Sequence, residues 1–163
     1  MIAWFKRYCQ KFRYVIKNDE GEPYLVRYRL WQSKHGVNVY LHHILRSDYD
    51  RALHDHPFDF VTILLWGSYI EWQPHWCKMF FDSPVERQTE PAGNRSFVQV
   101  RTHRGWLSVI RHKATDPHRL ELRNGKVWSL FLRGPKVREW GFYLNNEKWV
   151  PHTEYAAREK GNE

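Results

Sequence analysis

The fold of this chain is decided by the stretch RALHDHPFDFVTILLWGSYIEW, residues 51–72. Two histidines, His54 and His56, are one residue apart and precede a nearly unbroken apolar run over 58–66. A short, continuous apolar run of this kind indicates a strand that is covered on both faces. Gly67 then predicts a bend or bulge before the strand continues through GSYIEWQ. Because residues i and i+2 of a strand share a face, both imidazoles can converge on one point.

Segments of alternating apolar and polar residues recur on both sides of this stretch. Turn residues separate them, and Asn124-Gly125 predicts a tight hairpin turn. Strands are predicted at 24–32, 37–45, 58–66, 67–73, 76–81, 96–101, 106–113, 118–122, 126–134 and 137–144. About ten strands with no helical periodicity between them predict an all-β antiparallel fold, for which a jelly roll is the natural candidate.

The length and composition predict one domain spanning residues 1–163. A chain of 163 residues with 42% hydrophobic content can bury one core without disulfide support. We expect the core at about 24–144, with short extensions at 1–20 and 150–163. An amphipathic helix is predicted at 4–12, with a strand as the alternative. The stretch TEYAAREKGN (153–162), with an N-cap threonine and a glycine stop, predicts a terminal helix.

The charge balance favours anionic partners. The chain has 26 Lys and Arg against 18 Asp and Glu, a net charge of +8. It has only two cysteines and no apolar run near the roughly 20 residues of a membrane span, so we expect a cytoplasmic protein without a membrane partner. Basic and aromatic residues together also suit single-stranded nucleic acid. The basic residues are spread along the chain rather than clustered, which makes nucleic-acid binding the third-ranked hypothesis.

A third histidine, His118, completes a candidate metal site with His54 and His56. It begins a predicted strand after a polar turn and a proline. Neutral imidazoles bind divalent transition metals, and three of them with open coordination positions are typical of catalytic rather than structural sites. The alternative is a solvated or hydrogen-bonded pair, since ten histidines produce H-x-H pairs by chance. The position of the pair just before a buried strand favours the metal site.

These residues resemble the two motifs of the cupin superfamily. The matching stretches are HDHPFDFVTILLWG (54–67) and GWLSVIRHKATDPH (105–118), and the likeness extends over about 24–143. The resemblance implies a double-stranded β-helix with a divalent metal, Fe(II), Mn or Zn, held by His54, His56 and His118. More narrowly, the chain is similar to small uncharacterised cupins of bacteria and phages, which carry no assigned reaction over to it.

The chain departs from the cupin pattern at the acidic residue of the first motif. Asp59 stands where the motif has a glutamate, and the usual glycine upstream of the H-x-H pair is missing. Asp59 is either a metal ligand or a hydrogen-bond partner that orients His54 or His56. We favour the second role.

Four further residues are candidates for substrate binding: Arg29, Arg138, His42 and Trp140. An arginine directed into a barrel is costly unless it is paired or faces an anion, although a surface or salt-bridged arginine is the alternative. His42 and His43 are adjacent on a strand and therefore face opposite sides, and we take His42 as the pocket residue. A hydrogen-bonded core or edge histidine is the alternative. The remaining histidines are expected at the surface: His35, His75, His103, His112 and His152.

Together these features predict a metal-dependent enzyme of dioxygenase or isomerase type, acting on a small anionic substrate. A non-catalytic cupin that binds a sugar phosphate or nucleotide is the alternative. The resemblance also allows a homodimer. The fold alone cannot choose between these functions, because one scaffold hosts many.

Overall fold

The structure is a computed structural model that describes residues 12–18, 21–48, 52–75, 98–123, 125–144 and 148–155. For His75 and Val98 only the backbone is described. The helix expected at 4–12 lies outside these ranges except for residue 12, and the strand expected at 76–81 lies outside them entirely. Of the helix expected at 153–162, only a single helical turn at 152–155 is described.

The larger sheet has six antiparallel strands. They follow one another in the order β1-β2-β3-β10-β5-β8. Their bounds are Arg13–Lys17 (β1), Pro23–Trp31 (β2), Asn38–Ile44 (β3), Val127–Arg133 (β10), Phe60–Trp66 (β5) and Val109–His112 (β8).

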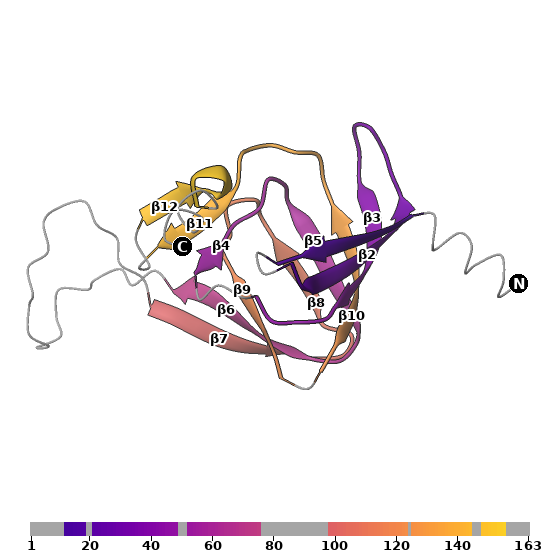
Figure 1. The fold of residues 1–163 in the computed structure, drawn as a ribbon, viewed down its shortest axis with the longest axis horizontal. Helices are drawn as coiled ribbons and strands as arrows, with labels where there is room; N and C mark the ends of the chain where they lie inside the picture. Colours follow the sequence, from indigo (N-terminus) through magenta and orange to yellow (C-terminus); the bar gives the residue numbers. More distant parts are fainter. Residues whose placement is uncertain are drawn as a thin grey trace, which may run out of the picture.

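The second layer consists of two three-stranded pieces. Their orders are β12-β11-β4 and β7-β6-β9. The bounds are Lys148–Pro151 (β12), Gly141–Leu144 (β11), Leu53–His54 (β4), Val98–Arg104 (β7), Tyr69–His75 (β6) and Arg119–Leu122 (β9). An antiparallel bridge between His54 and His118 joins the two pieces at β4 and β9. Figure 1 shows β4, β11 and β12 grouped away from β2, β3 and β10, so the two layers form a β sandwich.

The core fills the space between the two layers. Alternate residues of β3 point inward, so that Asn38, Tyr40, His42 and Ile44 are buried. The main apolar cluster joins both layers and consists of Leu25, Ile44, Leu64, Tyr69, Ile110 and Val127. A second cluster of three aromatic rings lies farther along the same sheet: Tyr40, Phe60 and Phe131. Burial of each such side chain stabilises the fold by about 1.5–3 kcal/mol.

Gly67 marks the point where the chain leaves one sheet for the other. Its φ is 83°, and a Cβ there would lie 2.7 Å from the carbonyl oxygen of Lys126. Only glycine fits both the positive φ and the close backbone approach. The segment after it is therefore a new strand, β6, in the opposite layer, and not the continuation of β5 that the sequence predicted.

The all-β antiparallel prediction is confirmed by these elements, and several details differ. β1 pairs with β2 although no strand was predicted at 13–17, and β12 pairs with β11 within the expected C-terminal extension. The strand predicted at 106–113 is shorter, because Gly105–Leu107 form a turn in which Leu107 has φ 61°.

Candidate metal centre and cavity

Strand pairing places three imidazoles on one face. His54 and His118 exchange backbone hydrogen bonds of 2.9 Å in both directions, so they are directly opposite each other. Directly opposed residues of an antiparallel pair project to the same side, and His56 follows His54 by two residues. The three ring centroids are consequently 5.0–5.2 Å apart.

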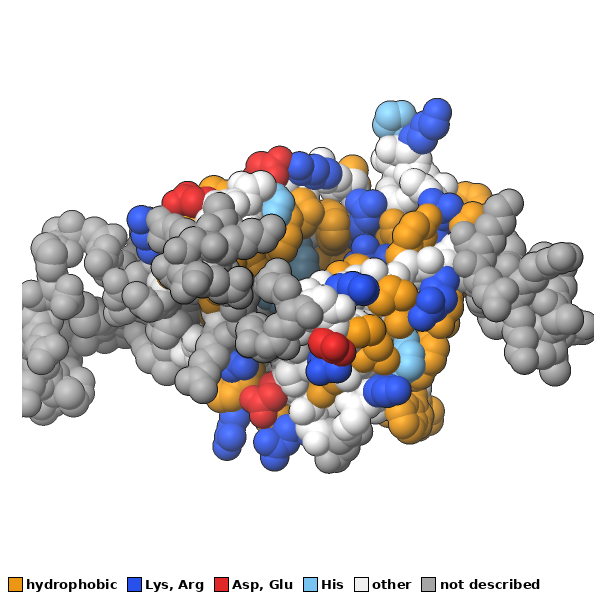
Figure 2. All heavy atoms as spheres, in the orientation of Figure 1, with side chains coloured by type: hydrophobic (Ala, Val, Ile, Leu, Met, Phe, Trp, Pro, Cys, Tyr) orange, Lys and Arg blue, Asp and Glu red, His pale blue; other side chains and the backbone are white. Residues whose placement is uncertain are grey.

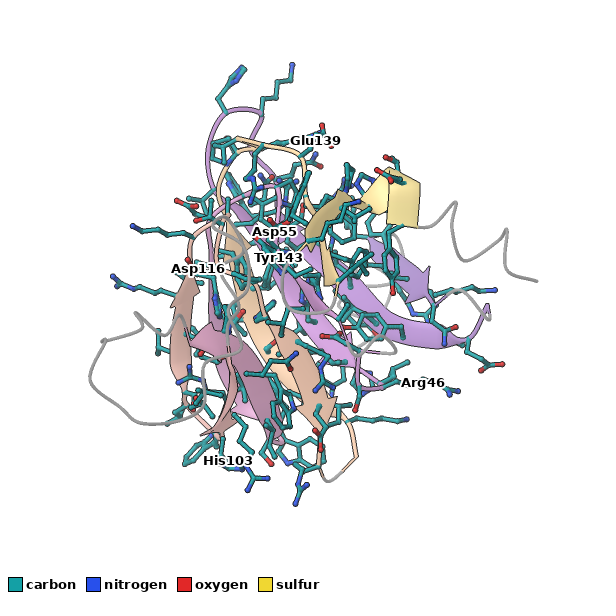
Figure 3. The ribbon with its side chains drawn as sticks, turned by 90° about the vertical axis from the view of Figure 1, so that its left-hand side faces the viewer. Arg46, Asp55, His103, Asp116, Glu139 and Tyr143 are labelled. Carbon is teal, nitrogen blue, oxygen red and sulfur yellow. The ribbon has the colours of Figure 1, made fainter. Side chains whose placement is uncertain are left out.

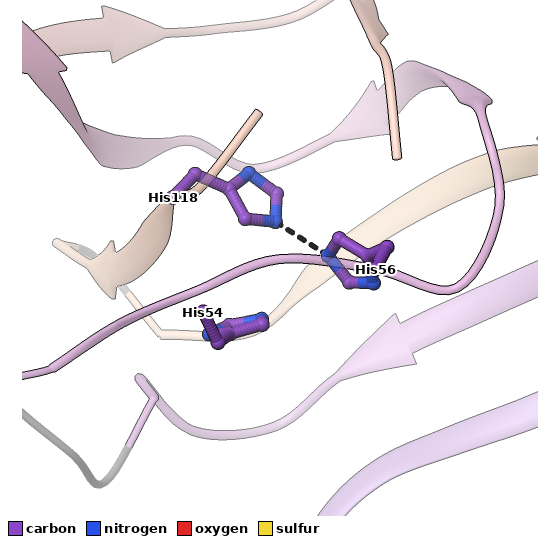
Figure 4. A group of neighbouring side chains, drawn as sticks. All are labelled: His54, His56 and His118. Carbon is purple, nitrogen blue, oxygen red and sulfur yellow. Dashed lines mark hydrogen bonds between the residues drawn. The ribbon is translucent and has the colours of Figure 1, made fainter. Parts of the chain in front are cut away.

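The ring nitrogens of these histidines converge as the ligands of one ion would. His54, His56 and His118 each offer a nitrogen, and these atoms lie within 4.8 Å of one another. The Nε2 atoms of His56 and His118 are 2.9 Å apart, and the dashed line in Figure 4 marks the hydrogen bond between them. Two nitrogens bound at right angles to an ion at about 2.1 Å would be about 3.0 Å apart. The donor set and its spacing therefore fit a divalent transition metal.

A buried carboxylate, Glu71 on β6, orients His118 from behind. Its Oε1 is 2.9 Å from His118 Nδ1 and 2.7 Å from His112 Nε2, and its Oε2 accepts a 2.8 Å hydrogen bond from Arg104 Nε. The two imidazoles hold the pKa of Glu71 far below its usual range against the opposing effect of burial. Because the ionised carboxylate only accepts, the proton of His118 resides on Nδ1. The Nε2 lone pair then faces His56, an arrangement that carboxylates typically impose on metal-binding histidines.

Burial keeps the other two imidazoles neutral. It lowers the pKa of His54 to about 4, partly offset by the charge of Asp48. The pKa of His56 is also lowered well below its usual value, by burial and then by the neighbouring histidines. Neutral imidazole is the form that binds a metal ion, so the protein environment favours the binding-competent state at neutral pH.

The three imidazoles open onto a cavity of about 350 Å³ between the sheets. Figure 2 shows a hollow in which histidine surface is recessed among hydrophobic side chains, with basic side chains at its margin. Aromatic rings form much of the lining, including Phe58, Phe60 and Phe131. Arg27 lines the same cavity and donates a 2.9 Å hydrogen bond from Nε to His42 Nε2.

A second carboxylate in the cavity wall, Asp48, lies beside His54. Its Oδ2 is 3.9 Å from His54 Nδ1 and accepts a 2.6 Å hydrogen bond from the backbone of Leu120. Its Oδ1 accepts from the hydroxyl of Tyr24. The negative charge near Nδ1 favours a proton there, which leaves Nε2 of His54 free to act as a ligand.

The residues predicted for substrate binding separate into two groups. His42 and Trp140 line the cavity, and the Trp140 ring lies 6.3 Å from that of His54. Arg29 instead donates to Gln32 and lies over the rings of Phe12 and Tyr14, outside the cavity lining. Arg29 thus lies outside this cavity, at a separate hollow that it lines together with Phe12, Leu30 and Trp31.

Arg138 is likewise placed away from the cavity. It donates a 2.6 Å hydrogen bond to Asp55, whose side chain is fully buried. Asp55 also accepts from the backbone of Gly141 at 2.7 Å and from Trp149 Nε1 at 3.0 Å. Figure 3 labels Asp55 next to Tyr143, a residue of β11 on which the charge of Asp55 acts. The Asp55 cluster thus anchors β11 and β12 to β4, and Arg138 is part of that anchor.

Asp59 does not contact the imidazoles. Its Oδ1 accepts a 2.7 Å hydrogen bond from the backbone of Ala114, and it is absent from the cavity lining. Asp59 is therefore seen neither as a ligand beside the three imidazoles nor as a hydrogen-bond partner that orients His54 or His56. The orienting carboxylate is Glu71, which acts on His118.

Two residues of the site, His112 and Glu71, were not predicted from the sequence. His112 was expected at the surface but is buried, because it alternates with Ile110 on the inward face of β8. Glu71 is also buried and lies two residues from Tyr69, so the same period-2 alternation could have indicated it. His35 and His103 are exposed as expected, and the side chain of His75 lies outside the described residues. His152 is half-buried, with its ring stacked on Trp140.

Comparisons with known proteins bear on the fold. No protein-family profile matches the sequence, and no curated protein matches it. The crystal structure of Fe(II)-HppE with the alternative substrate (S)-1-HPP is similar, with 13% identity over 76% of this chain and 56% of that chain, and a TM-score of 0.50. The chain thus spans a little over half the length of that protein. The chain has an all-β cupin fold.

Two other solved structures give lower TM-scores. The DMSP lyase DddQ from Ruegeria pomeroyi DSS-3 has 13% identity over 76% of this chain and 53% of that chain, with a TM-score of 0.48. An uncharacterized conserved protein with a double-stranded beta-helix domain from Klebsiella pneumoniae has 11% identity over 82% of this chain and 92% of that chain, with a TM-score of 0.47. In the part of the chain that the structure describes, no helix is long and apolar enough to cross a membrane.

Proposed function

We propose that this cupin is a divalent-metal-dependent enzyme that acts on a small anionic substrate, with His54, His56 and His118 as the metal ligands. The observation that supports this most directly is the convergence of three imidazoles, with nitrogens within 4.8 Å, at the wall of a cavity. An all-imidazole donor set leaves coordination positions open for substrate and suits Fe(II), Mn or Zn.

The chain's own groups position the reacting partners. The bound ion would act as a Lewis acid toward the substrate, in an oxidation by O₂ or an isomerisation. Glu71 keeps the proton of His118 on Nδ1, so that Nε2 remains a donor atom inside the cavity. The rings of Phe58, Phe60 and Phe131 line the space around the imidazoles and limit the access of water.

Metal content provides the test. Protein purified without added metal is analysed by inductively coupled plasma mass spectrometry, and then after loading with Fe(II), Mn(II) or Zn(II). We expect about one ion per chain in the wild type. The double variant His54→Ala, His118→Ala should lose it, and the single variant His54→Ala should bind it at least tenfold more weakly.

The matched control is the double variant His35→Ala, His103→Ala. Both side chains are exposed, and Figure 3 shows His103 at the periphery, so the control removes two imidazoles without touching the cavity. It should retain the wild-type metal content. A wild-type protein that carries no metal and cannot be loaded would contradict the proposal and leave non-catalytic ligand binding as the function of the cavity.

A further inference from the structure

Arg27 is a charged group in the cavity without a carboxylate partner among the described residues. It lies on β2 opposite His42, and none of the ion pairs between described residues includes it. Its contacts are the hydrogen bond from Nε to His42 Nε2 and the face of the Tyr40 ring, 5.0 Å from the guanidinium carbon. A half-buried cation without a counter-charge is costly, and a bound anion would offset this cost.

These contacts leave one edge of the guanidinium available. His42 takes the Nε hydrogen and Tyr40 covers one face, so the two terminal nitrogens retain donors for a ligand. His42 is itself held in place, because its ring stacks on Phe131 at 4.5 Å and is buried. The planar fork of arginine matches the two oxygens of a carboxylate. His42 is therefore a positioning residue for the Arg27 fork.

The two carboxylates of the cavity wall are occupied by other groups. Glu71 is paired with Arg104 and two imidazoles, and Asp48 accepts from Tyr24 and from the backbone of Leu120. Arg27 is accordingly the unpaired charge of the lining, within the residues that the structure describes. The positive charge of Arg133 also acts on Arg27, but Arg133 does not line the cavity, so a single guanidinium faces the ligand, which favours a carboxylate over a doubly charged phosphate.

We propose that Arg27, positioned by His42, binds the carboxylate of the substrate, and that the substrate is a small monocarboxylate with an apolar body. The apolar body follows from the aromatic and aliphatic lining, and the small size from a cavity of about 350 Å³ at the lower end of ligand pockets. The proposal rests on the proposed function in one respect only: the rest of the substrate would lie toward His54, His56 and His118.

The test compares acids with their neutral amides. Butanoate, phenylacetate and 3-phenylpropanoate are each titrated beside the primary amide, together with phenyl phosphate, into Zn(II)-loaded and chelator-treated full-length protein. Dissociation constants come from isothermal titration calorimetry and ligand-observed NMR. At least one carboxylate should bind the wild type about tenfold or more tightly than its amide, as expected for a charge-assisted hydrogen-bonded pair.

Matched variants assign that preference to Arg27. Arg27→Gln should abolish it, and Arg27→Lys should retain part of it, because the charge remains while the fork is lost. His42→Leu should weaken carboxylate binding, and His42→Gln should restore it in part by offering an oxygen to Arg27 Nε. Arg29→Gln, two residues along the same strand and outside the cavity lining, should bind as the wild type does. Melting curves establish that each variant is folded.

The outcomes separate this proposal from the proposed function. The carboxylate proposal is overturned if no acid binds better than its amide, if Arg27→Gln keeps the preference, or if phenyl phosphate binds more tightly than every carboxylate. A preference that persists in chelator-treated protein supports the role of Arg27 even if the protein never binds a metal. Stoichiometric metal without any acid preference would uphold the metal centre and reject the carboxylate site.

Discussion

Two polar clusters share the segment 54–56 and lie on opposite sides of it. On one side, His54 and His56 face the cavity, where their ring nitrogens lie near the Nε2 of His118. On the other side, Asp55 is fully buried and accepts hydrogen bonds from Arg138, Gly141 and Trp149. Neighbouring residues of the chain therefore have different roles. The imidazoles of His54 and His56 face the cavity as candidate metal ligands, whereas both oxygens of the Asp55 carboxylate accept hydrogen bonds from the protein.

The difference shows how structural and functional polar groups are recognised. A fully buried carboxylate such as Asp55, with both oxygens accepting hydrogen bonds from the protein, stabilises the fold and is not accessible to a ligand. The imidazole cluster is stabilised from outside by Glu71 and Asp48, while the Nε2 atoms of His56 and His118 hydrogen-bond to each other, an interaction that a bound ion would replace. Substitutions in the Asp55 cluster should lower the free energy of unfolding, and substitutions in the imidazole cluster should lower the affinity for metal.

The largest effect is expected for Asp55→Ala. The change leaves Arg138, Trp149 and the Gly141 amide without their acceptor, so the free energy of unfolding should fall by about 3–5 kcal/mol. Urea denaturation measures it. Glu139→Gln, which removes an exposed partner of Lys136, is the control and should unfold like the wild type. A loss for Asp55→Ala no greater than that of the control would mean that the cluster does not hold β11 and β12.

The imidazole side should respond to pH in the metal-free protein. Burial lowers the pKa of His54 to about 4 from its ordinary value of 6.5. Between these values the unfolded chain binds more protons, so stability is highest above about pH 6.5 and falls as the pH drops toward 4, by about 3 kcal/mol for this group.

Chelator-treated wild type and His54→Gln, unfolded in urea at pH 4.5 to 7.5, provide the measurement. Glutamine does not titrate, so its stability should vary less over this range. Parallel pH profiles for the two proteins would show that His54 is not held neutral by the fold.

Arg138→Met removes one hydrogen-bond donor from the Asp55 cluster and leaves the cavity lining unchanged. Asp55 keeps two of its three donors, so the free energy of unfolding should fall by about 1–3 kcal/mol. Since Arg138 does not line the cavity, the affinity for small carboxylates should stay at the wild-type value. Calorimetric titration with the acids used for Arg27 tests this. A loss of affinity without a loss of stability would show that Arg138 contacts the ligand.

The smallest effect is expected for Asp59→Asn. The asparagine carbonyl can still accept from the Ala114 amide, so stability should change by less than about 0.5 kcal/mol. Metal content should equal that of the wild type, because Asp59 touches none of the three imidazoles. Loss of the metal in a folded Asp59→Asn protein would identify Asp59 as a ligand.

Local periodicity made part of this site predictable. The two-residue spacing of His54 and His56 put their rings on one face, and the adjacency of His42 and His43 put theirs on opposite faces. The same alternation was overlooked for Glu71 and His112, whose neighbours Tyr69 and Ile110 share their faces. These placements depend only on strand geometry, which neighbouring residues fix.

The sequence by itself therefore determined the all-β class and the shared direction of the two imidazoles of the H-x-H pair, which precedes β5. The two-residue strand β4, which ends at His54, was not predicted. The tertiary structure alone decided which charged side chains meet. Arg27 and Arg29 share a face of β2, yet pairing with β3 sets Arg27 against His42 in the cavity and Arg29 near the end of the barrel. Arg138 reaches Asp55 across 83 residues of sequence. Such partners depend on register and sheet packing between distant segments, which local periodicity does not encode.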